Sequence, residues 1–313
     1  MKRACVSVDL DGLHHYARIH GLQESLLDEK ARSLHLTVAL PRLLALFEKL
    51  SLKATLFVVG EDATGEGAAA LKEAARGGHE LASHSHTHPY ALGAASAEAV
   101  EDELAHAEEA LLPLCGRRPV GFRAPGYTLS RAMVVALSRR EYLYDASVFP
   151  AAPYYLAKGA VLAGMALVGR TSASTLDSPR VLFAPRAPYR PDVRQPYRPG
   201  AAPLLELPMA VTPFLRVPFF GTLLTTAPWA VVEGAYRAVA KDNFLSLELH
   251  AVDVLEEGDG IPSALVRLQR DMRVARAEKE RRLLRVLGWL RRDFQPHTLE
   301  EAARALRAEG LPA

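Results

Sequence analysis

The sequence contains little cysteine: only Cys5 and Cys115 among 313 residues. Two cysteines cannot form a disulfide framework, and neither belongs to a CxxC pair of the kind that binds zinc or carries redox chemistry. Disulfide-stabilised scaffolds and cysteine-based zinc modules are therefore excluded.

Long apolar runs and an excess of one charge are also lacking. No uninterrupted apolar segment is long enough to cross a bilayer. The formal net charge is +2, well below the basic excess typical of proteins that follow a phosphate backbone. We therefore expect neither a membrane-spanning protein nor a nucleic-acid partner.

The first residues, Met1, Lys2 and Arg3, lead directly into a strand-like run that ends in an aspartate cluster. A signal peptide needs a longer apolar core and a small-residue cleavage site, and cleavage here would remove the aspartates. We therefore expect a cytoplasmic protein.

Strand-like and helix-like segments alternate from one end of the chain to the other. The expected strands are residues 4–9, 54–59, 79–83, 120–123, 142–149, 204–211 and 244–250. Apolar residues at helical spacing lie mainly between them, at residues 38–50, 68–76, 97–112, 131–139, 230–241, 275–292 and 300–306. This alternation predicts parallel βα units, in a barrel or an open sheet, within a single domain over residues 1–313.

Polar side chains stand at the ends of several predicted strands. Asp9 and Asp11 end the first strand, and His84 and His88 follow the third. In both architectures the functional site lies at the carboxyl ends of the strands. One carboxylate and two imidazoles can hold a divalent ion and leave positions open for water and substrate. The pattern predicts a metal site for hydrolysis, without choosing between zinc and iron.

The two aspartates are expected to differ in role, because Gly12 lets the backbone turn after them. One carboxylate can bind the metal while its neighbour accepts a proton from the bound water. Arg123, at another strand end, could orient Asp9 through a paired hydrogen bond. His250 closes the last strand and suits protonation of a leaving amine.

Together these residues resemble the polysaccharide deacetylase superfamily, whose shared NodB homology domain is a distorted (β/α) barrel. Its first motif, a base followed by a metal-binding aspartate, is matched by Asp9 and Asp11. The next two motifs, H-[S/T]-x-x-H and R-x-P, are matched by His84-Ser85-His86-Thr87-His88 and by Arg123-Ala124-Pro125. The last motif, which supplies the catalytic acid, is matched by His250.

The resemblance implies a role for each of these residues. Asp11, His84 and His88 would hold a divalent metal, with zinc as the first candidate and Fe²⁺, Co²⁺ and Ni²⁺ as alternatives. Asp9 would act as the base, His250 as the acid, and Arg123 would orient Asp9.

Two departures from the common family pattern limit the subfamilies that this sequence resembles. Leu10 separates aspartates that are usually adjacent, as in the branch with peptidoglycan-deacetylase-like, allantoinase-like and lipid-linked aminoarabinose deformylase-like proteins. Glu248 replaces the leucine that typically lines the acetyl pocket.

The family motif that adjusts the pKa of the acidic histidine has no clear match in this sequence. Several residues are therefore candidates for that role or for lining the acyl pocket. Asp145 is the nearest candidate by motif order, and Asp253 lies just after His250. Glu248, two residues before His250, and Pro125 and Tyr127, in the loop after Arg123, are further candidates.

A region rich in proline, tyrosine and arginine, residues 151–203, interrupts the rhythm of strands and helices. We expect it to be an ordered insertion or cap that sets specificity. The apolar stretch 213–221 is either a loop packed on the core or a surface that receives a lipid. The arginines of segment 275–292 are either a solvated face or a site for anionic headgroups.

These features together predict a metal-dependent amidohydrolase that removes an acetyl or formyl group from an amino sugar, possibly nucleotide- or lipid-linked. Peripheral contact with the inner membrane face would suit a lipid-linked substrate. The alternatives are an allantoinase-like hydrolase of cyclic amides or ureides, and a non-catalytic carbohydrate-binding relative. The joint presence of a base and an acid argues against the last.

Overall fold

The computed structural model describes residues 2–311, and its centre is a curled sheet of eight parallel strands. The strand order is β6-β5-β4-β3-β2-β1-β7, with β8 also paired to β1. The strands are β1 (Arg3–Asp9), β2 (Thr55–Val58), β3 (Glu80–Ser83), β4 (Gly121–Phe122), β5 (Tyr144–Asp145), β6 (Leu205–Glu206), β7 (Phe244–His250) and β8 (Gln295–His297). Parallel strands with helical crossovers confirm the predicted distorted (β/α) barrel.

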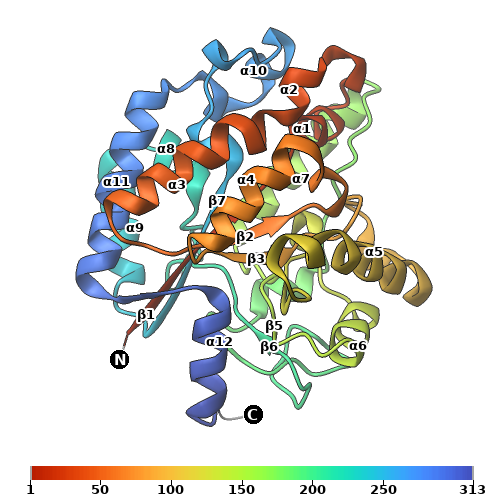
Figure 1. Cartoon of the computed structure of the whole chain (residues 1–313), viewed down its shortest axis with the longest axis vertical. Helices are drawn as coiled ribbons and strands as arrows, with labels where there is room; N and C mark the ends of the chain where they lie inside the picture. Colours follow the sequence, from red (N-terminus) through yellow and green to blue (C-terminus); the bar gives the residue numbers. More distant parts are fainter. Residues whose placement is uncertain (1, 312–313) are drawn as a thin grey trace.

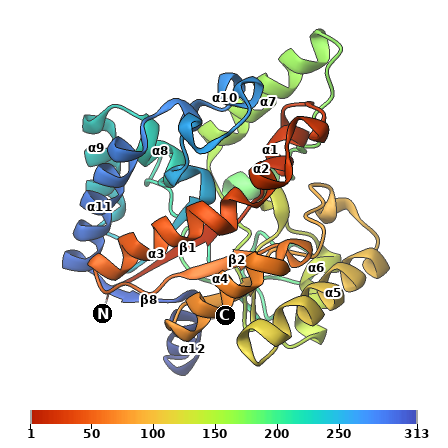
Figure 2. The same ribbon diagram turned by 45° about the horizontal axis from the view of Figure 1, so that its top comes forward.

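Helices surround the sheet, with α9 and α11 along one edge and α5 and α6 along the other (Figures 1 and 2). The α-helices are α1 (Leu13–Ile19), α2 (Glu29–Leu34), α3 (Leu40–Lys49), α4 (Gly65–Arg76), α5 (Ala97–Cys115), α6 (Arg131–Arg139), α7 (Ala152–Leu167), α8 (Gly221–Thr226), α9 (Trp229–Val239), α10 (Ser263–Leu268), α11 (Arg276–Asp293) and α12 (Leu299–Ala308). Within residues 2–311, none of the helices combines the length and the apolar character needed to span a bilayer.

Side chains of the two longest strands, β1 and β7, point alternately into the outer apolar core and into the barrel interior. Val6 and Val8 pack into the main apolar core beneath the outer helices, as do the leucines of β7. The residues between them face the barrel interior, because side chains alternate along a strand. These inward residues pair across the two strands as Cys5 with Ser246, Ser7 with Glu248, and Asp9 with His250. Charged groups therefore stand at the carboxyl end of the interior, above smaller polar and apolar ones.

The sheet remains open between β6 and β7, and the chain after β6 partly bridges this opening. The amide of Ala210 donates to the carbonyl of Ser246 at 2.9 Å, and Phe220 forms a parallel bridge with Glu248. Through these contacts the predicted apolar stretch 213–221 begins and ends against the interior, while Phe214 at its tip is fully exposed.

The region 151–203 is not entirely a loop, because it begins with α7. Figure 2 shows this helix projecting beyond the rest of the molecule. None of its residues is fully buried. The remainder of the region contains a short 3₁₀-helix, Pro179–Phe183, and irregular chain.

Candidate active site

The predicted site residues lie around one cavity at the carboxyl ends of β1, β3 and β7. The cavity has a volume of about 610 Å³. Its lining includes five of the residues singled out from the sequence, namely Asp9, Asp11, His84, Tyr127 and His250. The geometry falls into three groups: an Asp-His-His cluster, an aspartate held by an arginine, and a histidine held by a glutamate.

Asp11, His84 and His88 form the first group. The Asp11 Oδ1 atom lies 3.3 Å from Nε2 of both histidines, and all three side chains are buried. Each offers one ligand atom within 4.8 Å of the others. Asp11 Oδ1 and His88 Nε2 have no hydrogen-bond partner among the described residues. Buried polar atoms left in this way usually have an ion or a water as partner, so the donor set fits a divalent metal.

The orientation of His84 is fixed by a backbone carbonyl. Its Nδ1 lies 2.7 Å from the carbonyl oxygen of Arg123. Because a carbonyl only accepts hydrogen bonds, Nδ1 carries a proton, and Nε2, which faces Asp11, is the nitrogen available to a metal. A metal-binding imidazole held through its other nitrogen is a common arrangement.

The loop that carries the two histidines is shaped by two residues in the left-handed region and by a distant glutamate. Ser85 has φ 64° and His88 has φ 55°. The Ser85 hydroxyl accepts from the His88 amide at 3.1 Å. Glu103 of α5 accepts from the amides of His86 and Thr87 at 2.8 and 2.9 Å. No local sequence pattern indicates this role for Glu103, because it lies on a helix distant in sequence from the loop.

Asp9 and Arg123 form the second group, and both are almost completely buried. Arg123 Nη1 donates to Asp9 Oδ1 at 2.6 Å and to the Ser7 hydroxyl at 3.0 Å, while Nε donates to the carbonyl of Ala146 at 2.9 Å. The guanidinium also lies over the ring of Phe57 at 4.1 Å. The predicted contact is therefore made by one hydrogen bond rather than a pair, and Asp9 Oδ2 has no hydrogen-bond partner among residues 2–311.

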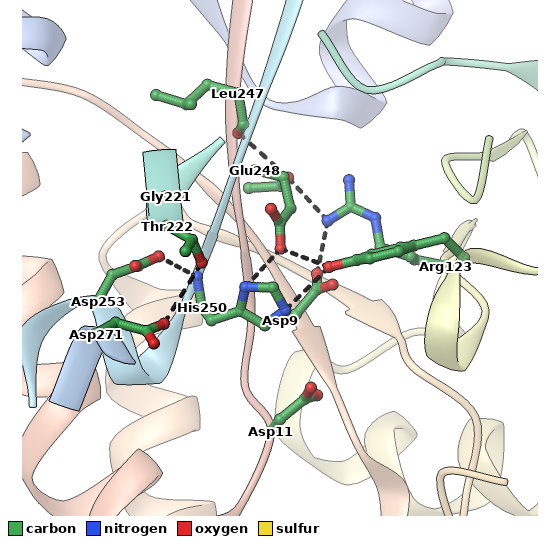
Figure 3. Close-up of polar contacts among 12 residues, drawn as sticks. Asp9, Asp11, Arg123, Gly221, Thr222, Leu247, Glu248, His250, Asp253 and Asp271 are labelled. Atoms are coloured by element: carbon green, nitrogen blue, oxygen red, sulfur yellow. Dashed lines mark hydrogen bonds and ion pairs between the residues drawn. The ribbon is translucent and has the colours of Figure 1, made fainter. Parts of the chain in front are cut away.

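His250 and Glu248 form the third group (Figure 3). The Glu248 Oε1 atom lies 2.8 Å from His250 Nδ1. The Tyr127 hydroxyl lies 3.0 Å from Nε2 and 3.1 Å from the same glutamate oxygen. Burial alone would lower the pKa of His250, but the negative charge and hydrogen bond of Glu248 outweigh it and hold this pKa well above its usual value.

A residue that adjusts the pKa of His250 is expected to contact its ring. Asp145 and Asp253 make other contacts. Asp145 accepts from the Ser147 hydroxyl at 2.6 Å and lies in register with Glu206, and burial raises its pKa. Asp253 accepts from the backbone amide of His250 at 2.8 Å rather than from its ring. The ring contact belongs to Glu248, another candidate for the pocket or for tuning.

The loop after Arg123 brings Tyr127 to the cavity. Gly126 and Tyr127 both have positive φ, 68° and 63°. Pro125 is buried behind them and does not line the cavity. The tight turn therefore aims the Tyr127 hydroxyl at the third group.

A buried lysine supports the turn that follows His250. Lys279 lies on α11, whose arginines are mostly paired with carboxylates. Its Nζ donates to the carbonyls of Val252 and Leu255 at 2.9 and 2.5 Å. The sequence pattern predicted either a solvated face or a site for anionic headgroups on this helix, and neither prediction included a buried role for Lys279.

Part of the chain is similar in sequence to known proteins. Residues 33–144 match the family model described as polysaccharide deacetylase. The peptidoglycan deacetylase of Helicobacter pylori is 31% identical over 155 residues, which are 49% of this chain and 52% of the relative. The match thus spans about half the length of that curated relative.

Two solved structures share the fold over nearly the whole chain. One is a protein from Mycobacterium smegmatis assigned as a polysaccharide deacetylase, with a TM-score of 0.63, 18% identity, and coverage of 99% of this chain and 91% of that one. The other, from Pseudomonas aeruginosa PAO1 and assigned likewise, has a TM-score of 0.62, 16% identity, and coverage of 99% and 92%.

The curled parallel sheet defines a barrel of the NodB type. Residues 33–144 thus carry the sequence pattern of the polysaccharide deacetylase family, within a chain that has this fold over nearly its whole length.

Proposed function

We propose that this chain is a metal-dependent amidohydrolase that removes an acetyl or formyl group from an amino sugar. The proposal rests on one observation above all: a metal-type donor set, a buried carboxylate and a charged histidine border one cavity. Members of the superfamily are hydrolases that act on C–N amide bonds, which agrees with this reaction.

Asp11, His84 and His88 are the proposed metal ligands. Zinc is the first candidate, because two imidazoles and one carboxylate suit it and leave a position open. A bound divalent ion would polarise the amide carbonyl of the substrate and make a water molecule beside it more acidic.

Asp9 is the proposed proton acceptor. Its Oδ1 is held by Arg123, and its Oδ2 points toward His84, at 3.9 Å from Nε2. Asp9 Oδ2 therefore lies beside the proposed metal ligands, at the place where the attacking water would stand. A fixed carboxylate at this distance can take the proton of that water.

His250 is the proposed proton donor to the departing amine. Glu248 occupies Nδ1, so Nε2 presents its proton on the side of the cavity, where the Tyr127 hydroxyl lies. Because Glu248 keeps the imidazole protonated at neutral pH, His250 is ready to donate when the C–N bond breaks. The products are a free amino sugar and acetate or formate.

We further propose that the sugar is phosphate-linked to a lipid and is taken from a membrane surface. Lys158 and Arg270 line the cavity and could pair with a phosphate, and burial lowers the pKa of Lys158 to about 8. Ala157 and Val161 of α7 line the same cavity.

The outer face of α7 supports this choice. Leu156 and Leu167 are 75% and 87% exposed, and Lys158 is the only charged residue of the helix. A helix with an apolar face turned outward normally rests on a partner or a lipid surface. Lipid is the occupant we propose, because an apolar chain could run from the cavity along this helix.

The experiment that tests the reaction is a screen for release of primary amine from N-acetylated and N-formylated amino sugars, with allantoin and hydantoins in parallel. We expect amine release from a sugar, and its loss in the His84→Ala/His88→Ala variant. Ring opening of the ureides without turnover of any sugar would replace this proposal with the allantoinase-like reaction.

A further inference from the structure

A second group of buried imidazoles lies beside the proposed metal site and is not used by the proposed reaction. His14 and His15, at the start of α1, are 6% and 0% exposed. Glu61 lies in the turn Gly60–Asp62 that follows β2. One atom from each of these three side chains lies within 4.8 Å of the others.

The polar atoms of this group lack the partners that buried polar atoms normally have. His14 Nδ1 and both ring nitrogens of His15 have no hydrogen-bond partner among the described residues. The Glu61 carboxylate lies close to this group, with Oε1 at 3.9 Å from His14 Nε2. Leaving a buried donor or acceptor unpaired is unfavourable, so an unpaired cluster of this kind points to a ligand.

A neighbouring pair adds to the same pattern. His35 Nε2 and Asp62 Oδ2 are 3.2 Å apart, and both are buried atoms without a hydrogen bond. His35 begins a π-helical turn, His35–Ala39, inserted between α2 and α3. Turns of this type are often found at functional sites.

The backbone is shaped to make room for these imidazoles. A Cβ atom at Gly12 would lie 2.6 Å from Cε1 and 2.7 Å from Nδ1 of His14. The same atom would lie 3.3 Å from Cε1 of His35, so Gly12 lets both rings approach one point. A larger residue at position 12 would displace His14.

A surface cavity lies beside this group and is lined by Glu61, but not by His14 or His15. Glu61, Asp62 and His35 line this cavity of about 830 Å³. None of the proposed catalytic residues lines that cavity, whereas Asp9 and Asp11 line the one described above. Glu61 is therefore the member of the group that faces solvent, on a side separate from the proposed catalytic residues.

From this geometry we propose that His14, His15 and Glu61 form a second divalent-cation site, distinct from Asp11, His84 and His88. Imidazoles with one carboxylate favour zinc, nickel or cobalt over calcium or magnesium, which prefer oxygen ligands. Burial lowers the pKa of His14, so the ring is neutral at pH 7, the form that binds a metal. The 3.9 Å between His14 Nε2 and Glu61 Oε1 can close by a few tenths of an ångström, because Glu61 is exposed and free to move.

The second site would also brace the first. The ring of His15 packs against that of His88, with centroids 4.0 Å apart. The amides of Gly60 and Glu61 donate to the carbonyls of Ser85 and His86 at 3.0 Å. An ion held by His15 and Glu61 would therefore connect α1 to the loop that carries His84 and His88.

The test is a count of bound metal. Protein stripped with a chelator is loaded with Zn²⁺ or Co²⁺, passed through a desalting column and measured by elemental mass spectrometry. We expect about two equivalents in the wild type and about one in each of the variants His84→Ala/His88→Ala, His14→Gln and Glu61→Gln. Glu66→Gln, an exposed carboxylate on the rim of the same surface cavity, is the matched control and should keep both.

A wild type that binds one equivalent, lost in His84→Ala/His88→Ala and unchanged in His14→Gln and Glu61→Gln, would overturn the second site and leave the proposed reaction intact. The Glu61 side chain is exposed, so loss of the ion in Glu61→Gln cannot be ascribed to misfolding. Unchanged thermal unfolding of the metal-free variant would verify that it folds like the wild type. The inference does not depend on the identity of the substrate.

Discussion

At the scale of single residues, each proposed catalytic group is held by one buried neighbour. Arg123 holds Asp9, the carbonyl of Arg123 holds His84, and Glu248 holds His250. These contacts set protonation as well as position, because a carboxylate beside an imidazole favours the charged ring. Glu248 therefore deserves the closest test among them.

We expect Glu248→Gln to shift the alkaline limb of the pH profile of kcat/KM to lower pH. His250 must be protonated to act as the acid, and its pKa is raised chiefly by the charge of Glu248, with smaller contributions from Asp9 and Asp11. Removing the Glu248 charge lowers this pKa, so activity should begin to fall at lower pH. Tyr127→Phe, which leaves that charge in place, is the control. An alkaline limb that stays in place in Glu248→Gln would exclude His250 as the acid.

The sequence was most informative about residues inside recognisable motifs. Asp9, Asp11, His84, His88, Arg123 and His250 could be placed around one site, because parallel strands end at one edge of the sheet. Glu103 and Lys279 could not, since each acts on a segment distant in sequence. Glu248 and His250 share one face of β7 because they are two residues apart on a strand, but the sequence alone did not indicate that the Glu248 carboxylate contacts the His250 ring.

At the scale of elements, α7 is the feature that the sequence pattern failed to predict. Prediction of helices relied on an apolar stripe at helical spacing, and α7 has none because no face of it is fully buried. β8 was missed for a related reason. Its residues, Gln295–His297, have low strand propensity, and they form a strand only through pairing with β1.

Replacing Leu156 and Leu167 by glutamate should reduce sedimentation of the protein with lipid vesicles. Neither side chain lines the cavity, so hydrolysis of a soluble sugar should be unchanged. Burying two charged side chains in the lipid interface is unfavourable, so we expect binding to fall at least tenfold.

The matched comparison is Phe214→Glu/Leu215→Glu, which alters the exposed tip of the apolar stretch 213–221 and leaves α7 intact. We expect this variant to sediment with vesicles like the wild type. If the Phe214/Leu215 variant alone lost binding, the loop would be the membrane contact; unchanged sedimentation of both would remove the membrane proposal.

At the scale of the whole molecule, a buried glutamate ties together elements far apart in the sequence. Glu80, at the start of β3, accepts hydrogen bonds from Thr55 of β2 at 2.6 Å, Tyr144 of β5 at 2.8 Å and the amide of Glu300 in α12 at 3.0 Å. Burial raises its pKa from 4.5 to about 7 despite these donors. No local pattern marks Glu80, since its role arises only when the barrel is assembled.

Glu80 should make the stability of the fold depend on pH. Its pKa is higher in the folded than in the unfolded chain, so its contribution is present below pH 4.5 and is lost as the pH rises through about 7. The free energy of unfolding of the wild type relative to Glu80→Gln should therefore fall by about 3 kcal/mol between pH 4.5 and 7 and stay level above pH 8. Urea unfolding across this range measures the difference, with the exposed Glu73→Gln as control. A difference that is constant with pH would contradict this role for Glu80.

The most direct test of the proposed hydrolytic site is the metal content of Asp11, His84 and His88. Purified wild-type protein and the His84→Ala/His88→Ala variant would be compared by elemental mass spectrometry, before and after loading with Zn²⁺, Co²⁺ or Fe²⁺. We predict that the variant holds about one equivalent less than the wild type and releases no amine from any acylated sugar. A wild type that holds no more metal than the variant, with each of the three ions, would contradict the proposed hydrolytic site.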